Sequence, residues 1–158
     1  MRAALVAAAL VAAPTAAGAD RDPWAPGTTP ATYARPGGRV RIHYVTTTAD
    51  AVPALDADAS GVPDFVEEAA RRGDESLAAF AALGFRPPLP DGTLGGDDRL
   101  DIYLRDLAGA DGSFTADSCA QTPFTCSGHM TIENDFVGSV MVTVADRGLP
   151  SISEISPK

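Results

Sequence analysis

The sequence lacks the motifs that most often mark an enzyme. It contains no GxSxG, no glycine-rich phosphate loop, no CxxC and no HExxH, the helical zinc-binding motif of metalloproteases. The two histidines, His43 and His129, lie far apart in the sequence and belong to no ligand pair. We expect each of them to be structural or solvated. As written, the chain holds no complete catalytic constellation.

Positive charge and long apolar runs are also scarce. The formal net charge is −9, and a chain this acidic is not expected to bind nucleic acid or anionic membranes. Beyond the first twenty residues, no segment is apolar enough to cross a bilayer, so we expect no membrane span. The length suits one domain with a modest core.

The amino terminus has the pattern of a secretory signal. Met1 and Arg2 precede a short apolar run at residues 3–13, and Ala17–Ala19 supplies an A-x-A cleavage site. We therefore predict a signal peptide over residues 1–19 and a secreted, extracellular protein. Because Arg2 is the one charged residue removed with it, the mature net charge would be −10, against −9 for the whole chain.

Cys119 and Cys126 are the two cysteines. In an exported protein, two cysteines this close indicate one local disulfide. Closing so short a loop would stabilise the fold by roughly 2.5 kcal/mol in the chain-entropy model. A metal or redox role is the alternative, although neither a CxxC spacing nor a nearby histidine cluster accompanies them.

Hydrophobic periodicity predicts a mixed α+β domain. Residues 40–46 alternate as a strand does, and residues 66–81 recur at helical spacing. Residues 99–105 and 129–133 predict two further strands, joined by a loop that contains the cysteines. Residues 135–146 suit a helix or a strand, and periodicity does not decide between them. The order is strand, helix, strand, strand and one ambiguous element, which favours a mixed sheet with one long helix.

Individual positions sharpen these elements. Pro63 suits a first helical turn, Gly84 suits the left-handed residue after the helix, and Pro87 and Pro88 prevent its continuation. The inward strand positions are expected to be Val40, Ile42 and Tyr44 in the first strand and Leu100, Ile102 and Leu104 in the second. The buried face of the helix is expected to carry Val66, Ala69, Ala70, Gly73, Leu77, Phe80 and Ala81.

The stretch from Asp56 to Glu67 matches a twelve-residue calcium loop. Ca²⁺ takes six to eight oxygen ligands, and a short loop can supply them only by bending sharply, as Gly61 permits. Val62 would contribute its backbone carbonyl, and Glu67 would close the coordination shell. The predicted calcium ligands are Asp56, Asp58, Ser60, Val62, Asp64 and Glu67.

The alternative is that these acids only cap the following helix. That explains Asp64 and Glu67 but not the spacing of the earlier residues. Pro53 interrupts any helix that would enter the loop, and Pro63 has no N–H with which to join a paired loop. We therefore expect a solitary structural loop that leads into one helix.

A second acidic cluster comprises Asp97, Asp98 and Asp101. Two of these residues lie in a glycine-rich turn, and the third falls in a strand. We interpret them as turn residues plus one exposed strand position, rather than as a second metal site.

At several blocks the sequence resembles a family of secreted bacterial zinc metalloproteases, over about residues 40–145. In that family the segment after the last block reads approximately T-V-A-H-E-x-x-H, where two histidines bind zinc and the glutamate is the general base. Here Thr143-Val-Ala145 is followed by Asp146-Arg-Gly148. The blocks are Arg41–Tyr44, Asp56–Val66, Leu83–Phe85, Gly96–Leu104 and Ile132–Phe136.

The resemblance implies the front portion of a protease, truncated before the catalytic helix. It divides the chain into a signal peptide (1–19), an extended leader (20–39), a metalloprotease-like region (40–145) and an aberrant tail (146–158). Zn²⁺ would be the family's cofactor, but no residue here matches its ligands, so neither peptidase activity nor a peptide substrate is expected of the chain. The alternatives are a secreted calcium-binding module that functions as it stands and a non-functional fragment with exposed apolar surface.

Overall fold

The structure is a computed structural model that describes residues 21, 23–121 and 123–137. The predicted signal peptide and tail lie outside these residues, as does most of the ambiguous segment 135–146. Among the described residues, no helix is both long and apolar enough to cross a membrane.

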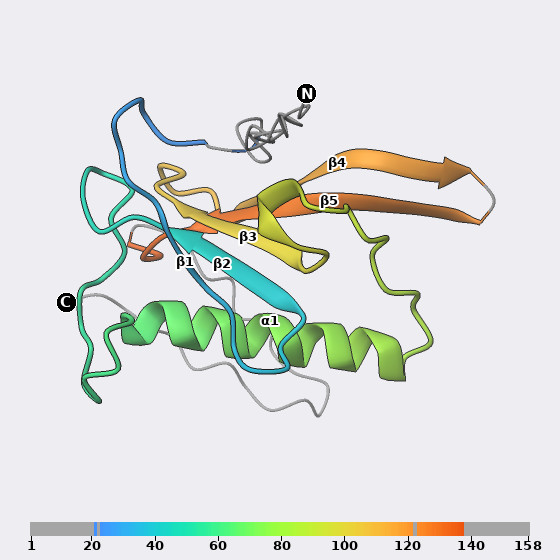
Figure 1. The fold of residues 1–158 in the computed structure, drawn as a ribbon, viewed down its shortest axis with the longest axis horizontal. Coiled ribbons are helices and arrows are strands. Elements are labelled where there is room, and N and C mark those ends of the chain that lie inside the picture. The colour runs from blue at the N-terminus through green and yellow to red at the C-terminus, as the bar shows by residue number, and fades with distance from the viewer. Residues whose placement is uncertain (1–20, 22, 122, 138–158) are drawn as a thin grey trace, which may run out of the picture.

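A mixed five-stranded sheet and one α-helix make up the described part of the chain, so the fold class is α+β (Figure 1). The strand order is β1-β2-β3-β5-β4. The central pairs β2–β3 and β3–β5 are parallel, and the edge strands β1 and β4 pair antiparallel. The elements are β1 (Ala31–Tyr33), β2 (Val40–Tyr44), α1 (Asp64–Ala82), the 3₁₀ turn η2 (Leu94–Gly96), β3 (Leu100–Arg105), β4 (Gly112–Gln121) and β5 (Phe124–Glu133).

The main core lies between α1 and one face of the sheet (Figure 1). Alternation along the strands sends every second side chain toward the helix, as the sequence predicts. Ile42 and Leu104 are fully buried there against Val66 and Ala70 of α1. Gly73 lets the helix approach closely, since a Cβ at this position would lie 3.1 Å from Val40 Cγ1.

Local signals set both ends of α1. The helix begins at Asp64, directly after Pro63. At its other end, Gly84 has a φ of 85°, and the Phe85 N–H donates to the Phe80 carbonyl at 3.0 Å. The Gly84 N–H donates to the Ala81 carbonyl at 3.0 Å, which completes a Schellman motif. The predicted glycine stop is confirmed.

The predicted buried face of α1 is wrong over its last turns. Phe80 is 54% exposed and Ala81 is also exposed. The physical reason is that α1 contacts β2 and β1, whereas its last turns lie beside an open hollow under β4 and β5. Helical spacing shows which residues share a face, but not how far the sheet extends beneath it.

The cysteine segment is a long β-hairpin rather than the predicted loop. Strand β4 was not predicted, and β5 begins five residues before the predicted strand 129–133. Consequently His129 lies inside β5 and not at its start. Cys119 and Cys126 are cross-strand partners whose sulfur atoms are 2.04 Å apart, as in a disulfide. Most of β4 is exposed, and exposed polar strands carry little hydrophobic periodicity.

The leader adds a strand and covers the second face of the sheet. β1 pairs with β2, so the leader is not wholly irregular. Upstream of it, Trp24 is buried with Val45 and Tyr103 in a second, smaller core. Tyr103 alternates with the helix-facing residues of β3, which places this core on the side opposite α1.

Candidate functional site

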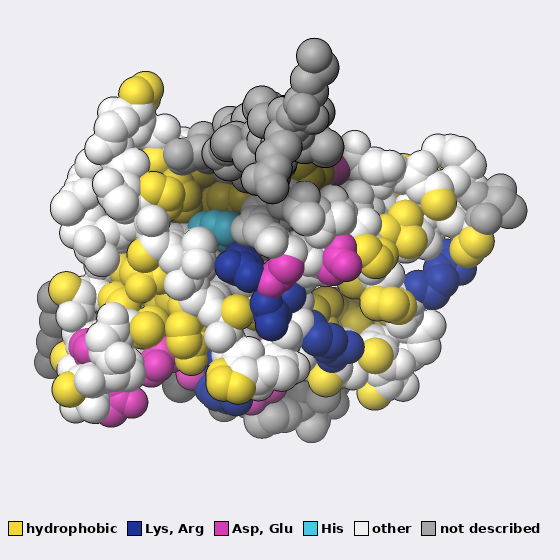
Figure 2. Space-filling view, in the orientation of Figure 1, with side chains coloured by type: hydrophobic (Ala, Val, Ile, Leu, Met, Phe, Trp, Pro, Cys, Tyr) yellow, Lys and Arg dark blue, Asp and Glu magenta, His cyan; other side chains and the backbone are white. Residues whose placement is uncertain are grey.

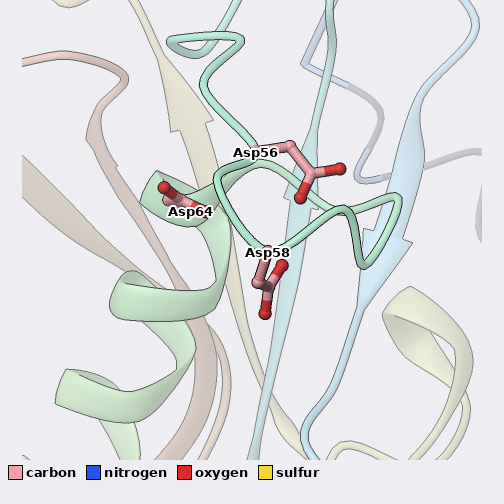
Figure 3. Close-up of side chains that lie close together, drawn as sticks. All are labelled: Asp56, Asp58 and Asp64. Carbon is pink, nitrogen blue, oxygen red and sulfur yellow. The ribbon is translucent and has the colours of Figure 1, made fainter.

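The loop Asp56–Glu67 brings acidic side chains together at the start of α1. Asp56 and Asp58 lie on the loop and Asp64 lies at the first residue of the helix (Figure 3). One carboxylate oxygen from each of the three lies within 4.8 Å of the others. Asp58 is exposed, so an ion could reach the cluster from solvent.

The backbone of the loop turns around Asp56. Its two carboxylate oxygens accept hydrogen bonds from the N–H groups of Ser60, at 3.0 Å, and Gly61, at 2.9 Å. Asp58 Oδ1 also accepts from the Ser60 N–H, at 3.0 Å. Gly61 has a φ of 86°, the left-handed conformation that makes the bend and favours glycine.

Ser60 connects the remaining predicted ligands. Its Oγ lies 3.2 Å from the Val62 carbonyl oxygen and 3.2 Å from Glu67 Oε1. The hydroxyl thus stands between two oxygens that were predicted to coordinate the same ion. The structure thus brings three of the six predicted ligands together, namely the carboxylates of Asp56, Asp58 and Asp64. Glu67 does not join this group, and it and the Val62 carbonyl contact the Ser60 hydroxyl instead.

Hydrogen bonds close the base of the loop and fix the segment that precedes it. The Asp64 N–H donates to the Leu55 carbonyl at 2.8 Å, which closes the base of the loop. The Asn134 amide donates to the carbonyls of Ala49, at 3.1 Å, and Ala51, at 2.8 Å. Asn134 is buried, and the sequence analysis did not single it out.

The capping alternative accounts for part of the loop. Asp64 and Glu67 lie in the first turn of α1, where acids favour the helix dipole. However, the N-cap residue is Pro63, and no side chain caps the helix there. Capping therefore does not explain why carboxylate oxygens of Asp56 and Asp58 lie within 4.8 Å of one from Asp64.

A second polar cluster lies on the sheet face opposite α1 and includes Asp101. The prediction that Asp101 is an exposed strand position is wrong, because its exposed fraction is 0%. Asp101 Oδ2 accepts a hydrogen bond from Arg21 Nη1 at 2.6 Å, and its Oδ1 lies 2.7 Å from His43 Nε2. Alternation placed Asp101 away from the helix, but the leader buries that face too. The other two acids behave as turn residues, since Asp97 pairs with Arg41 and Asp98 is exposed.

Asp91 and Asp117 complete this cluster, and we call the three carboxylates Asp91, Asp101 and Asp117 the carboxylate pocket. Arg21 Nη1 donates to Asp91 Oδ2 at 2.7 Å, and Arg21 Nη2 donates to Asp117. The side chains of Arg21 and Asp91 are each 3% exposed. Arg21, Asp91 and Asp117 were not predicted as site residues, because no local pattern in the sequence relates them.

Both histidines border the carboxylate pocket. The His43 ring stacks on Tyr103 with centroids 4.3 Å apart, and the His129 ring meets Tyr103 edge-on at 5.4 Å. His129 Nδ1 lies 3.7 Å from Asp117 Oδ1. A structural role for His43 thus follows from its burial between an aromatic ring and a carboxylate.

Burial and pairing act against each other in this pocket. Burial raises the pKa of Asp91, and it outweighs the hydrogen bond and charge of Arg21, which lower it. For Arg21, burial disfavours the charged form, yet the hydrogen bond to Asp91 and the three carboxylate charges leave its pKa raised. Burial also raises the pKa of Tyr103 to about 12.

The described residues do not fit a zinc site. Among them, Asp56, Asp58 and Asp64 form the one group of three or more His, Cys, Asp or Glu residues whose ligand atoms converge. Zn²⁺ prefers nitrogen and sulfur donors, whereas this group offers carboxylate oxygens, which suit a hard cation such as Ca²⁺. His43 Nε2 lies 2.7 Å from Asp101 Oδ1 and His129 Nδ1 lies 3.7 Å from Asp117 Oδ1, so both histidines stand beside the other cluster.

An apolar hollow of about 860 Å³ lies between the last turns of α1 and the β4–β5 hairpin. Figure 2 shows hydrophobic side chains gathered in this region, to the right of the molecule. Phe80 is 54% exposed, Phe85 62% and Phe114 52%. So much exposed aromatic surface on one side is unusual for an isolated soluble domain. The apolar residues that line the hollow include Leu77, Phe80, Phe85, Leu89, Phe114 and Met130.

Comparisons of the chain with protein-family models, with curated proteins and with solved structures found no match.

Proposed function

We propose that this chain is an exported calcium-binding protein in which the loop Asp56–Glu67 holds a structural Ca²⁺. The observation that carries the proposal is the convergence of carboxylate oxygens from Asp56, Asp58 and Asp64 to within 4.8 Å of one another. At about 5 Å, two carboxylates repel by roughly 0.8 kcal/mol even at the dielectric constant of water. A divalent cation at their centre replaces this repulsion with attraction.

The donor set favours calcium over magnesium and zinc. The six predicted oxygen donors come from one short loop, and Ca²⁺ tolerates the irregular geometry that such a loop provides. Mg²⁺ demands near-ideal octahedral geometry and keeps several waters. In the bound state, the Val62 carbonyl and Glu67 would turn from Ser60 Oγ toward the ion. The ion would then join the β2–α1 connection to the first turn of the helix.

Calcium is expected to raise the melting temperature of the protein. Extracellular calcium modules bind with dissociation constants of about 0.1–1 mM. At about 5 mM Ca²⁺, mass action then stabilises the folded state by roughly 1–2 kcal/mol, or about 4–8 °C in a domain of this size. Thermal unfolding followed by circular dichroism, in calcium and in a chelator, measures the shift.

Substitutions test whether the calcium-dependent shift in melting temperature depends on the loop Asp56–Glu67. Asp58→Ala removes an exposed ligand and Glu67→Ala removes the closing one, so both should abolish most of the calcium shift. Asp98→Ala removes an exposed carboxylate outside the loop and should keep the shift. An unchanged melting temperature in calcium and in chelator would refute the proposal.

We further propose that the calcium loop supports the front portion of a zinc metalloprotease-like fold that has no peptidase activity of its own. The apolar hollow supports this proposal, because a further helix of such a fold would need an apolar surface of this kind on which to pack. No hydrolytic step is assigned to the described residues, since they offer no zinc site. Purified chain should not hydrolyse a denatured protein substrate in the presence of Zn²⁺. Hydrolysis that a chelator abolishes and Zn²⁺ restores would contradict the proposal.

A further inference from the structure

The carboxylate pocket gathers its three acids from separate parts of the chain. Asp91 follows α1, Asp101 lies in β3, and Asp117 lies in β4 next to the bulge between Ala116 and Ser118. Their common partner is Arg21, which is 70, 80 and 96 residues away from them in sequence. Fold assembly therefore creates an anionic pocket around one guanidinium group.

The pocket carries more negative charge than Arg21 neutralises. Three carboxylates face one guanidinium, which leaves a formal charge of −2 when both histidines are neutral. A single carboxylate would suffice to pair an arginine, and a second buried one carries a desolvation cost of its own. Asp91 and Asp101 are the two buried acids, whereas Asp117 is an exposed residue of β4. This excess of negative charge attracts a cation, which can be a side chain of the protein or a cation from solution.

Polar atoms that have no partner show that the pocket is not fully used. Among the residues that the structure describes, none donates a hydrogen bond to Asp91 Oδ1, although the Asp91 side chain is only 3% exposed. Arg21 Nε is likewise buried and unpartnered. Arg21 therefore contacts the carboxylates through its two terminal nitrogens alone. Asp91 Oδ1 remains as an acceptor that a guanidinium group in another orientation could bond.

The arrangement of acceptors suits a guanidinium better than an ammonium. Arg21 Nη1 contacts two carboxylates, and Nη2 contacts the third. A planar guanidinium has five N–H donors spread over a fixed fork, whereas an ammonium concentrates its charge and its three donors on one nitrogen. Tyr103 lies beside Asp101 on the same sheet face, with His43 stacked on it, and provides an aromatic wall.

We propose that the carboxylate pocket is a guanidinium-binding site, which Arg21 occupies from within the chain and which accepts a guanidinium cation from solution when Arg21 is removed. The leader holds Arg21 in place through Trp24 and through β1, which begins ten residues later. The ligand class is thus a guanidinium group, and the leader supplies one from within the chain as the side chain of Arg21.

The test is chemical rescue of Arg21→Ala in the full chain. The probes are methylguanidinium and, as a matched cation, methylammonium, each at about 50 mM. With a dissociation constant of a few millimolar, methylguanidinium should raise the melting temperature of the variant by about 3–5 °C in a saturable manner. Methylammonium should give less than about a third of this shift, and the original chain should respond to neither.

A second variant and two amino-acid amides extend the test. Arg21→Lys retains a cation in the pocket but cannot contact all three carboxylates, so it should fold and still gain stability from methylguanidinium. N-acetyl-arginine amide should match methylguanidinium if a peptide-borne side chain can enter, whereas N-acetyl-lysine amide should not. Equal shifts with both cations, or the same shift in the original chain, would overturn the proposal. So would the absence of a methylguanidinium effect on both Arg21 variants.

Discussion

Replacing Asp101 with alanine is expected to lower the free energy of unfolding by about 3–5 kcal/mol. Asp101 is fully buried and pairs with both Arg21 and His43, at 2.6 Å and 2.7 Å. Truncating Asp101 leaves the buried His43 Nε2 without its carboxylate partner and removes one of the two contacts of Arg21 Nη1, which keeps Asp91. Each buried polar group that loses a partner costs about 1–3 kcal/mol, and the two losses together give the expected effect. Urea unfolding followed by circular dichroism at neutral pH measures the loss.

Asp98→Ala is the control for Asp101. It removes a carboxylate three residues earlier, from an exposed position, and should change the free energy of unfolding by no more than about 0.5 kcal/mol. If Asp101→Ala also stayed within this range, the carboxylate pocket could not be an organising element of the fold.

Asp91→Asn is a comparison within the same pocket, and it should be milder. Burial raises the pKa of Asp91 above its ordinary value of 3.8. A raised pKa means that the folded state binds the Asp91 proton more tightly than the unfolded state does. The protonated carboxyl therefore stabilises the fold below pH 3.8, and this stabilisation is lost as the pH rises through the folded pKa. Relative to the original chain, Asp91→Asn should therefore gain stability between about pH 4 and neutral pH. The free energy of unfolding of Asp91→Asn minus that of the original chain, measured at these two pH values, should be larger at neutral pH.

Replacing Leu104 with alanine is expected to lower the free energy of unfolding by about 2–5 kcal/mol. Leu104 is fully buried in β3, in the cluster that α1 forms with the sheet. Removing its branched end loses the transfer free energy of the side chain and leaves a cavity that the rigid surroundings fill only in part. Urea unfolding again measures the effect.

The same substitution at Leu83 is the matched control. Leu83 follows α1 and is 73% exposed, so its replacement should cost less than about 0.5 kcal/mol. Comparable losses at the two positions would mean that the main core does not lie between α1 and the sheet.

The elements with regular hydrophobic periodicity were predicted well. The strands β2 and β3 and the helix α1 lie within two or three residues of their expected bounds, and the glycine stop at Gly84 is confirmed. These features depend on contacts between residues a few positions apart. Strand β4 escaped prediction because its side chains are mostly exposed and polar, so burial leaves no pattern in them.

The same contrast holds for the two clusters. The loop Asp56–Glu67 could be proposed from spacing because a single turn of backbone brings its oxygens together. The carboxylate pocket could not, since Arg21, Asp91, Asp101 and Asp117 meet only when the leader, β3 and β4 are in place. Asp101 shows the difference most clearly. Alternation correctly predicted that its side chain lies on the sheet face away from α1, but the expectation that this position is exposed was wrong.

By itself, the sequence determined the features with local causes: the strand–helix–strand order, the end of α1 and a loop in which six oxygen donors lie within twelve residues. The tertiary structure alone decided which sheet face the leader buries, where the hairpin leaves apolar surface open and which acids surround Arg21. The physical reason is that alternation assigns side chains to a face, whereas burial depends on what other parts of the chain pack against that face.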